Sequence, residues 1–363
     1  MNTRTFRHPM LVLPPPAVVL KHLFGVSPTS IVFGTVEGKF DRKTITAIGS
    51  GKAKDATYER FRDTLPPEIA TYFRAETDAI KAAGEEAEFG PIGALAEATS
   101  WRVFFGAGRR TIGPGSVDGW PEPISRRLFA LDDASVRVAK AAEQDEFSEA
   151  AAIIRTSAIG PYVDGPVLNQ LRAGNSREAV GSAIATVQMA GTLFLFACFD
   201  KAFGRPDTTN PTRSMAARFM PENPNDPTDQ PMPRFLRYLF EHYRITGKAD
   251  AVRKGLGGSG SIVDRSEYRK IERWVSGEAF PEEGAFVDLL ITVNRTQEVT
   301  AAADPDHAFK KCLYYGLRFL SRLSVEVAET PHAVPGGSFA GYFALYDAIY
   351  QSLENPATGT AAR

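Results

Sequence analysis

Two short basic stretches carry the side chains whose types and spacing suggest chemistry. The first reads RKTITAIGSGKAK over residues 42–54, and the second reads YRKIERWVSGEAF over residues 268–280. When their Ser-Gly pairs are aligned, Ile45 aligns with Ile271. In each stretch apolar residues recur at helical spacing between basic and hydroxyl side chains, and glycine is the residue that most often ends a helix. Both stretches therefore predict a short cationic helix that can donate hydrogen bonds to an anionic partner.

The two stretches resemble, in part, the lambda-repressor-like helix-turn-helix family, also called the XRE type. The first is similar to the entry side of that motif through Phe33, Gly34, Gly38, Thr44 and Ile45. The second is similar to its exit side through Trp274, Gly277, Pro281, Phe286 and Leu289. The first has Asp55 where the family has proline, and the second has GLGGSGS at 255–261 where the family has a tight turn. The resemblance implies that double-stranded DNA is the partner.

A recognition helix buries one stripe and presents hydrogen-bond donors to base edges and phosphates from its outer side. The candidate contacts of the first stretch are Arg42, Lys43, Thr44 and Thr46, followed by Lys52 and Lys54, which would approach the flanking backbone. Those of the second stretch are Arg265, Ser266, Arg269, Lys270 and Arg273. Ser266 is also a candidate N-cap.

Each stretch also has a plainer interpretation. Because β-branched residues crowd both arms of SIVFGTV and KFDRKTITAI, the first stretch could instead belong to a β-hairpin. The second could be an amphipathic surface helix of mixed charge that buries Trp274.

Composition limits the remaining possibilities. The chain has 363 residues, 43% hydrophobic and 23% charged, so it should fold into two or three domains. With 42 basic and 43 acidic residues it has no overall attraction for polyanions. Residues 1–63 and residues 234–273 are nevertheless basic, each with ten Lys or Arg against five Asp or Glu, whereas residues 64–150 are acidic. Any attraction for DNA must therefore be local.

Helical periodicity predicts a mainly α, multi-domain fold. The expected helices cover residues 69–83, 135–156, 176–202, 233–245, 308–327 and 339–353. The expected regions are a basic N-terminal helix-turn-helix-like element (1–65), a helical body (66–204) with an exposed loop (105–123), a proline-rich linker (205–233), a second such element (234–296) and a C-terminal helical region with a disordered tail (297–363).

Other patterns favour structural roles. The glycine run at 255–260 lacks the strand and lysine of a phosphate-binding loop. DPDH at 304–307 is explained by capping of the helix that follows it. The C-terminal tyrosines and phenylalanines favour a core or a helix–helix interface. The two C-terminal helices could also serve for dimerisation. Cys198 and Cys312 have no partner motif and favour a cytoplasmic protein. The uncharged residues 180–199 predict a buried helix, with a membrane span as the alternative.

The sequence thus predicts a cytoplasmic, bacterial-type, sequence-specific DNA-binding protein that regulates transcription or acts as an accessory factor. No catalytic residue, cofactor, metal or membrane is expected. Two alternatives remain open: a helical protein-interaction or scaffold protein that does not bind nucleic acid, and an enzyme whose site is assembled in the helical body.

Overall fold

The computed structural model describes residues 12–14, 16, 19, 40–41, 43–44, 47, 54–64, 96, 100–102, 122–207, 210, 212–223, 226–243, 265–296, 307–328 and 340–353. About 76% of the interpretable residues are helical, and none of them lies in a strand. One isolated antiparallel bridge joins Pro206 to Ser214. The predicted mainly α fold class is confirmed.

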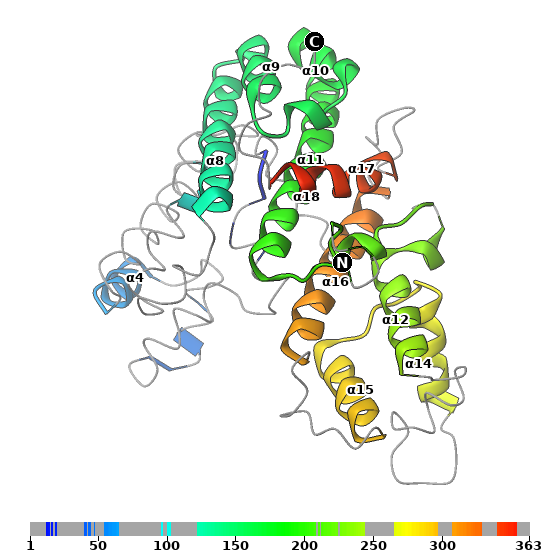
Figure 1. The fold of residues 1–363 in the computed structure, drawn as a ribbon. Helices are drawn as coiled ribbons and strands as arrows, with labels where there is room; N and C mark the ends of the chain where they lie inside the picture. The colour runs from blue at the N-terminus through cyan, green and yellow to red at the C-terminus, as the bar shows by residue number, and fades with distance from the viewer. Residues whose placement is uncertain are drawn as a thin grey trace. The chain divides into compact units, whose positions relative to one another are not determined.

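Contacts along the chain define two compact units, which we describe separately. Unit 1 comprises Met1–Lys21, Gly25–Cys198 and Ser352–Arg363. Its helices are α4 (Asp55–Arg62), α8 (Glu122–Glu143), α9 (Phe147–Thr156), α10 (Gly165–Ala173) and, up to Cys198, α11 (Arg177–Phe203), with the 3-10 turn η2 at Gly160–Tyr162. Helix α9 packs against both α8 and α10 (Figure 1).

The single helix expected over 135–156 is divided into α8 and α9. Asp145 between them has a left-handed backbone with φ of 57°, and the Glu146 N–H donates to the Ala141 carbonyl at 2.8 Å. This is the hydrogen bond of a left-handed helix end, made with aspartate in place of glycine. Aspartate is a weak signal for such an end, which is why periodicity alone missed it.

Helix α11 is apolar on all sides, and this is why it is buried. From Val180 to Cys198 most side chains are buried, among them Val187, Leu193 and Phe194. A helix without a polar face belongs in a core. Residues Ala179–Ala202 are long and apolar enough to cross a membrane, but 83% of the most apolar window is already buried by protein. Helix α11 therefore fits the expected buried helix.

Buried polar groups fix distant segments onto α8. The Asp132 carboxylate accepts hydrogen bonds from the Trp101 and Arg102 N–H groups, both at 2.9 Å. The Ser135 hydroxyl oxygen accepts from the Val12 and Leu13 N–H groups at 3.0 and 3.3 Å. Burial raises the pKa of Asp132 to about 6, although the two N–H donors act in the opposite direction.

Unit 2 comprises His22–Phe24 and Phe199–Gln351. It contains η3 (Ala216–Phe219), η4 (Pro227–Asp229), α12 (Pro231–His242), α14 (Arg265–Val275), α15 (Glu283–Thr296), α16 (His307–Ala328), α17 (Ala340–Ala344) and α18 (Tyr346–Ser352). Helix α12 is central to this unit, since it packs against α14, α16, η3 and η4 (Figure 1).

The proline-rich segment 205–233 was expected to be a linker, yet many of its described residues are packed into unit 2. Met215, Ala216, Ala217, Phe219 and Met220 are all at most 6% exposed. Prolines at 227 and 231 begin η4 and α12, where a missing N–H costs nothing. The prolines of this segment therefore lie at the starts of short helical elements.

Three hydrogen-bonded side chains attach the end of α11 to the rest of unit 2. The Tyr346 hydroxyl of α18 donates to the Asp200 carboxylate at 2.6 Å, and the Ser214 hydroxyl donates to the same carboxylate oxygen. Burial raises the pKa of Asp200 to about 6, against the effect of these two donors. Arg213 and Asp347 form an ion pair at 2.6 Å beside them.

The C-terminal aromatic residues form core, as the sequence predicted. The following side chains are at most 6% exposed: Tyr314, Tyr315, Phe319, Tyr342, Phe343, Tyr346 and Tyr350. Since these rings are already covered within the chain, they do not form an exposed platform for stacking bases. The expected dimer through these helices stays a prediction.

Candidate nucleic-acid interface

Helix α14 separates its apolar and charged side chains onto opposite sides. Ile271 and Trp274, three positions apart, are 0% and 6% exposed, and α14 packs against α12. Arg269, Lys270 and Arg273 are exposed. Side chains three or four positions apart share a helix face, so Arg269 and Arg273 lie on one outer side. The second basic stretch is thus a cationic helix that buries Ile271 and Trp274, while Val275, the third apolar residue expected in this stripe, is half-buried.

The N-terminal part of α14 holds the other two candidates of this stretch. Arg265 and Ser266 lie in the first turn of the helix, but their side chains fall outside the described residues. In the sequence, Arg265 is four positions before Arg269 and eight before Arg273, and a four-residue spacing places neighbouring positions on one helix face. Positions at this spacing are separated by roughly 6 Å along the axis.

Glycine is required where α14 ends. Gly277 has a left-handed backbone with φ of +79°, and the Ala279 N–H donates to the Arg273 carbonyl at 3.1 Å. A Cβ atom at Gly277 would also collide with the carbonyl oxygen of Pro227. The predicted glycine stop is therefore confirmed, and this glycine additionally allows a close backbone approach.

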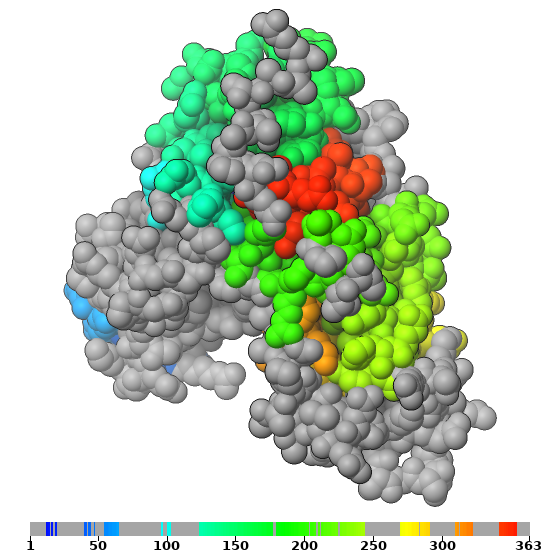
Figure 2. All heavy atoms as spheres, in the orientation of Figure 1, coloured from blue at the N-terminus to red at the C-terminus, as the bar shows by residue number. Residues whose placement is uncertain are grey.

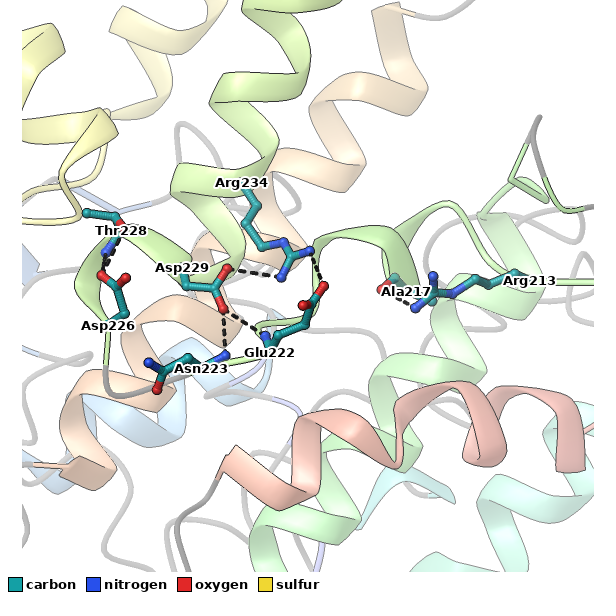
Figure 3. Close-up of polar contacts among 8 residues, drawn as sticks. All are labelled: Arg213, Ala217, Glu222, Asn223, Asp226, Thr228, Asp229 and Arg234. Carbon is teal, nitrogen blue, oxygen red and sulfur yellow. Dashed lines mark hydrogen bonds and ion pairs between the residues drawn. The ribbon is translucent and has the colours of Figure 1, made fainter.

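The loop that carries Pro227 is held by a polar network at the start of α12 (Figure 3). The Asp229 carboxylate accepts hydrogen bonds from the Glu222 and Asn223 N–H groups at 2.8 and 2.6 Å. Arg234 of α12 forms ion pairs with Asp229 at 3.0 Å and with Glu222 at 3.1 Å. This network fixes the loop against which the end of α14 rests.

Two smaller contacts complete the same region (Figure 3). The Asp226 carboxylate accepts hydrogen bonds from the Thr228 hydroxyl and N–H, both at 2.8 Å. These bonds lower the pKa of Asp226, because they stabilise its ionised form. Arg213 donates to the Ala217 carbonyl at 3.2 Å, which ties the bridge at Ser214 to η3.

Aromatic packing fixes the chain that follows α14. The Phe286 ring of α15 stacks on the Tyr314 ring of α16 with centroids 4.1 Å apart. The Tyr314 hydroxyl donates to the Pro281 carbonyl at 2.7 Å and accepts from Arg318 at 2.9 Å. Pro281, Phe286 and Leu289 are buried.

The exposed residues of α14 carry both signs of charge, since Glu272 is exposed together with Arg269, Lys270 and Arg273. Arg273 lies 3.8 Å from Glu278, and both side chains are more than half exposed. An exposed pair of this kind contributes about 0 to 1 kcal/mol, so the Arg273 guanidinium can exchange it for a stronger anion. Among the described residues, Arg269 forms no ion pair.

The first basic stretch is helical at three of its described positions, and its last residue, Lys54, is the extended N-cap residue before α4. Lys43, Thr44 and Ala47 are helical, and the Asp41 carboxylate accepts hydrogen bonds from the Thr44 N–H at 2.8 Å and its hydroxyl at 3.1 Å. Asp41 therefore caps this helix. The hairpin interpretation is wrong for these positions, since a capped helix start replaces the second arm of the hairpin.

Helix α4 follows the first basic stretch in the chain. Helix α4 contains Phe61, which is fully buried and packs edge to face on Phe40 with centroids 5.4 Å apart. Arg60 lies over the Phe40 ring at 4.9 Å. Phe40, which precedes the helical residues Lys43 and Thr44, is thus joined to α4 through an aromatic pair.

The candidate DNA-contacting residues of this first stretch differ in whether their side chains are exposed. Lys43 and Lys54 are exposed, whereas Thr44 is half-buried and its hydroxyl is engaged by Asp41. Thr44 therefore acts within the helix cap in this structure. Arg42, Thr46 and Lys52 lie outside the described residues.

The remaining motifs add no second candidate site. The glycine run at 255–260 and residues 304–306 lie outside the described residues, and His307 begins α16. The described part of the chain contains no cluster of three metal-binding side chains.

An open depression of about 1100 Å³ lies beside Asp145, Glu149 and Arg172 in unit 1. All its lining side chains are exposed or half-buried, so it lacks the buried polar groups typical of a catalytic pocket.

The residues that position α14 could not be found from the sequence. Pro227 and Gly277 are 50 positions apart, and Tyr314 meets Pro281 across another 33. The glycine at 277 can be recognised in the sequence as a helix stop, but the residue that it approaches cannot. Comparisons with protein-family models, curated proteins and solved structures found no match to this chain.

Proposed function

We propose that the protein is a sequence-specific double-stranded DNA-binding protein, a transcriptional regulator or accessory factor, and that α14 is a recognition helix. The observation that supports the proposal is the exposed basic side of α14 opposite its buried stripe. Arg269, Lys270 and Arg273 are exposed, while Ile271 and Trp274 attach the helix to α12.

The dimensions of the helix suit a duplex. The major groove of B-DNA, about 12 Å wide, admits an α-helix. A row of arginines at four-residue spacing can donate to guanine edges in the groove or to phosphates at its rim. The attached face needs a rigid support, and the buried Trp274 and the stop at Gly277 supply it.

The first basic stretch is the second candidate reader in this proposal. Lys43 and Lys54 are exposed and would add contacts to the DNA backbone. Arg42, Thr46 and Lys52 are further candidates from the sequence. Two such elements in one chain could occupy two half-sites, as dimers of single readers do.

The proposal is tested by selecting binding sites for the full chain from a randomised duplex library at low salt. We expect enrichment of a common sequence by the wild-type chain. R269Q is expected to relax the preference at one position and to weaken binding by about 1 to 3 kcal/mol. Failure of the wild-type chain to retain any duplex at low salt would reject the proposal.

The scaffold alternative is separated from DNA binding by charge reversal at Lys43 together with Arg42. A DNA reader should lose affinity for duplex DNA, whereas a scaffold protein should keep its protein partner. The buried state of the C-terminal aromatic rings gives the scaffold alternative no exposed apolar surface at those residues.

A further inference from the structure

Unit 2 contains a second cationic feature, on a different part of α12 from its polar network. It is centred on Tyr238 and is formed by three elements: η3, α12 and the first turns of α16. We refer to these residues as the Tyr238 cluster: Arg218, Tyr238, His242, Tyr243 and Lys310. Atoms of α12 reach the molecular surface in Figure 2.

The cations of the cluster are held by aromatic rings. The Arg218 guanidinium lies over the Tyr238 ring, 5.0 Å from its centroid. The Lys310 ammonium lies 5.0 Å from the Tyr243 centroid and donates to the Tyr243 hydroxyl at 2.5 Å. His242 stacks on Tyr238 with centroids 5.7 Å apart. The rings orient these cations without neutralising them.

The charge of the cluster is predominantly positive. Arg218 forms no ion pair within the described part of the chain, and it is half-buried, as is Lys310. Burial raises the pKa of Tyr238, while the positive charges of Arg218 and Lys310 act in the opposite direction and Asp207 adds to the rise. Asp207 is 4% exposed and therefore lies beneath the surface. Glu241 is the exposed acidic residue next to His242.

Such an arrangement suits phosphate oxygens. A guanidinium that stacks on a ring keeps its N–H donors in the plane of the fork, the geometry that matches two phosphate oxygens. Lysine contributes a point charge, and the exposed His242 ring can donate an N–H. None of these groups selects among bases, so the cluster favours contact with a repeated backbone.

We propose that the Tyr238 cluster binds the phosphodiester backbone of the same DNA duplex that α14 contacts. The inference rests on the proposed function. Helix α12 connects the two surfaces, because it packs against α14 and also carries Tyr238 and His242.

The test is the salt dependence of duplex binding by the full chain, measured by fluorescence anisotropy with a labelled duplex. The variant R218Q/K310Q removes two cations of the cluster. Each lost phosphate contact reduces the slope of log affinity against log salt by about 0.9, so we expect a slope smaller by about 1.8. The matched control K140Q/R155Q removes two exposed cations of unit 1 and should leave the slope unchanged.

The outcomes separate this inference from the proposed function. If R269Q/R273Q weakens binding but R218Q/K310Q has the slope of the control, the cluster does not contact DNA and only the inference is overturned. If R218Q/K310Q lowers the slope and R269Q/R273Q has no effect, the cluster contacts DNA, but the role of α14 and the claim that both surfaces share one duplex are rejected. If the wild-type chain does not bind the duplex, both fail.

An acidic protein is the competing ligand, and poly-glutamate is the probe for it. Loss of poly-glutamate binding by R218Q/K310Q, together with an unchanged DNA slope, would overturn the inference. Equal thermal unfolding of wild type, R218Q/K310Q and K140Q/R155Q is required for each comparison, since it shows that the variants are folded.

Discussion

The two basic stretches have similar sequences but differ in how they are fixed. In unit 2, α14 is attached by Ile271 and Trp274, and its glycine stop rests on the Pro227 carbonyl. In unit 1, the helical residues Lys43 and Thr44 follow an aspartate cap, and α4 contacts Phe40, the residue before that cap, through Phe61. The same sequence pattern, basic residues followed by Ser-Gly, therefore occurs in two helical segments that are held in different ways. One is held by packing of its side chains against a neighbouring helix, and the other by a hydrogen-bonded cap at its start.

The largest expected effect comes from removing the aromatic anchor of each element. W274A and F61A each leave a cavity at a buried ring, and we expect each to lower the free energy of unfolding by about 3 to 5 kcal/mol. Chemical denaturation measures this. R273Q, which changes the exposed neighbour of Trp274, should stay within about 0.5 kcal/mol. A small effect of W274A would mean that α14 is not anchored as described.

The second effect concerns the buried carboxyl group of Asp200, in contrast to the exposed Asp41 that caps the first helix. The pKa of Asp200 is raised to about 6 in the folded protein, so the folded state binds more protons than the unfolded state between about pH 4 and 6. The free energy of unfolding should therefore fall as pH rises through this window. The full change is on the order of 3 kcal/mol.

D200N retains a side-chain oxygen that can accept from Tyr346 and Ser214 but cannot titrate. The difference in unfolding free energy between wild type and D200N should vary with pH only in that window. Parallel stability curves from pH 4 to pH 7 would show that Asp200 is not buried in this way.

The third effect concerns the stop of α14. G277A forces a left-handed backbone onto a residue with a side chain and drives Cβ into the Pro227 carbonyl, so we expect a loss of roughly 1 to 3 kcal/mol. Gly284 in α15 has open space around it, and G284A should instead stabilise the protein by up to about 1 kcal/mol. Equal effects of the two substitutions in thermal unfolding would contradict the close approach at Gly277.

The smallest effect concerns the cap of the first helix. The Thr44 N–H lowers the pKa of Asp41 by stabilising its carboxylate. The cap therefore contributes at neutral pH and is lost as pH falls through this lowered pKa. We expect D41A to reduce the hydrogen-exchange protection of residues 43–47 while leaving α4 unchanged. Full protection in D41A would show that the cap does not hold this helix.

Periodicity in the sequence was sufficient for much of the fold. The uncharged run became the buried helix α11, and the predicted helices at 233–245 and 308–327 correspond to α12 and α16 within a few residues. Periodicity failed where one residue decided the outcome. Asp145 divided a predicted helix, and the proline-rich segment packed its Met215 and Phe219 side chains into unit 2.

The candidate site was predictable only in its local parts. The buried stripe of α14 and the stop at Gly277 follow from spacing and from the backbone freedom of glycine. The Tyr238 cluster was not predictable, because Arg218 and Lys310, 92 positions apart, lie over two neighbouring rings, Tyr238 and Tyr243, at the end of a third element. Contacts of this kind depend on tertiary packing, which single-chain patterns do not encode.

The most direct test is the affinity of the full chain for its selected duplex, measured against salt concentration for wild type, R269Q/R273Q and the control K140Q/R155Q. We predict that R269Q/R273Q weakens binding at least tenfold, a change of about 1.4 kcal/mol, while the control matches wild type. Equal affinities of wild type and R269Q/R273Q at every salt concentration would contradict the assignment of α14 as the DNA-reading helix.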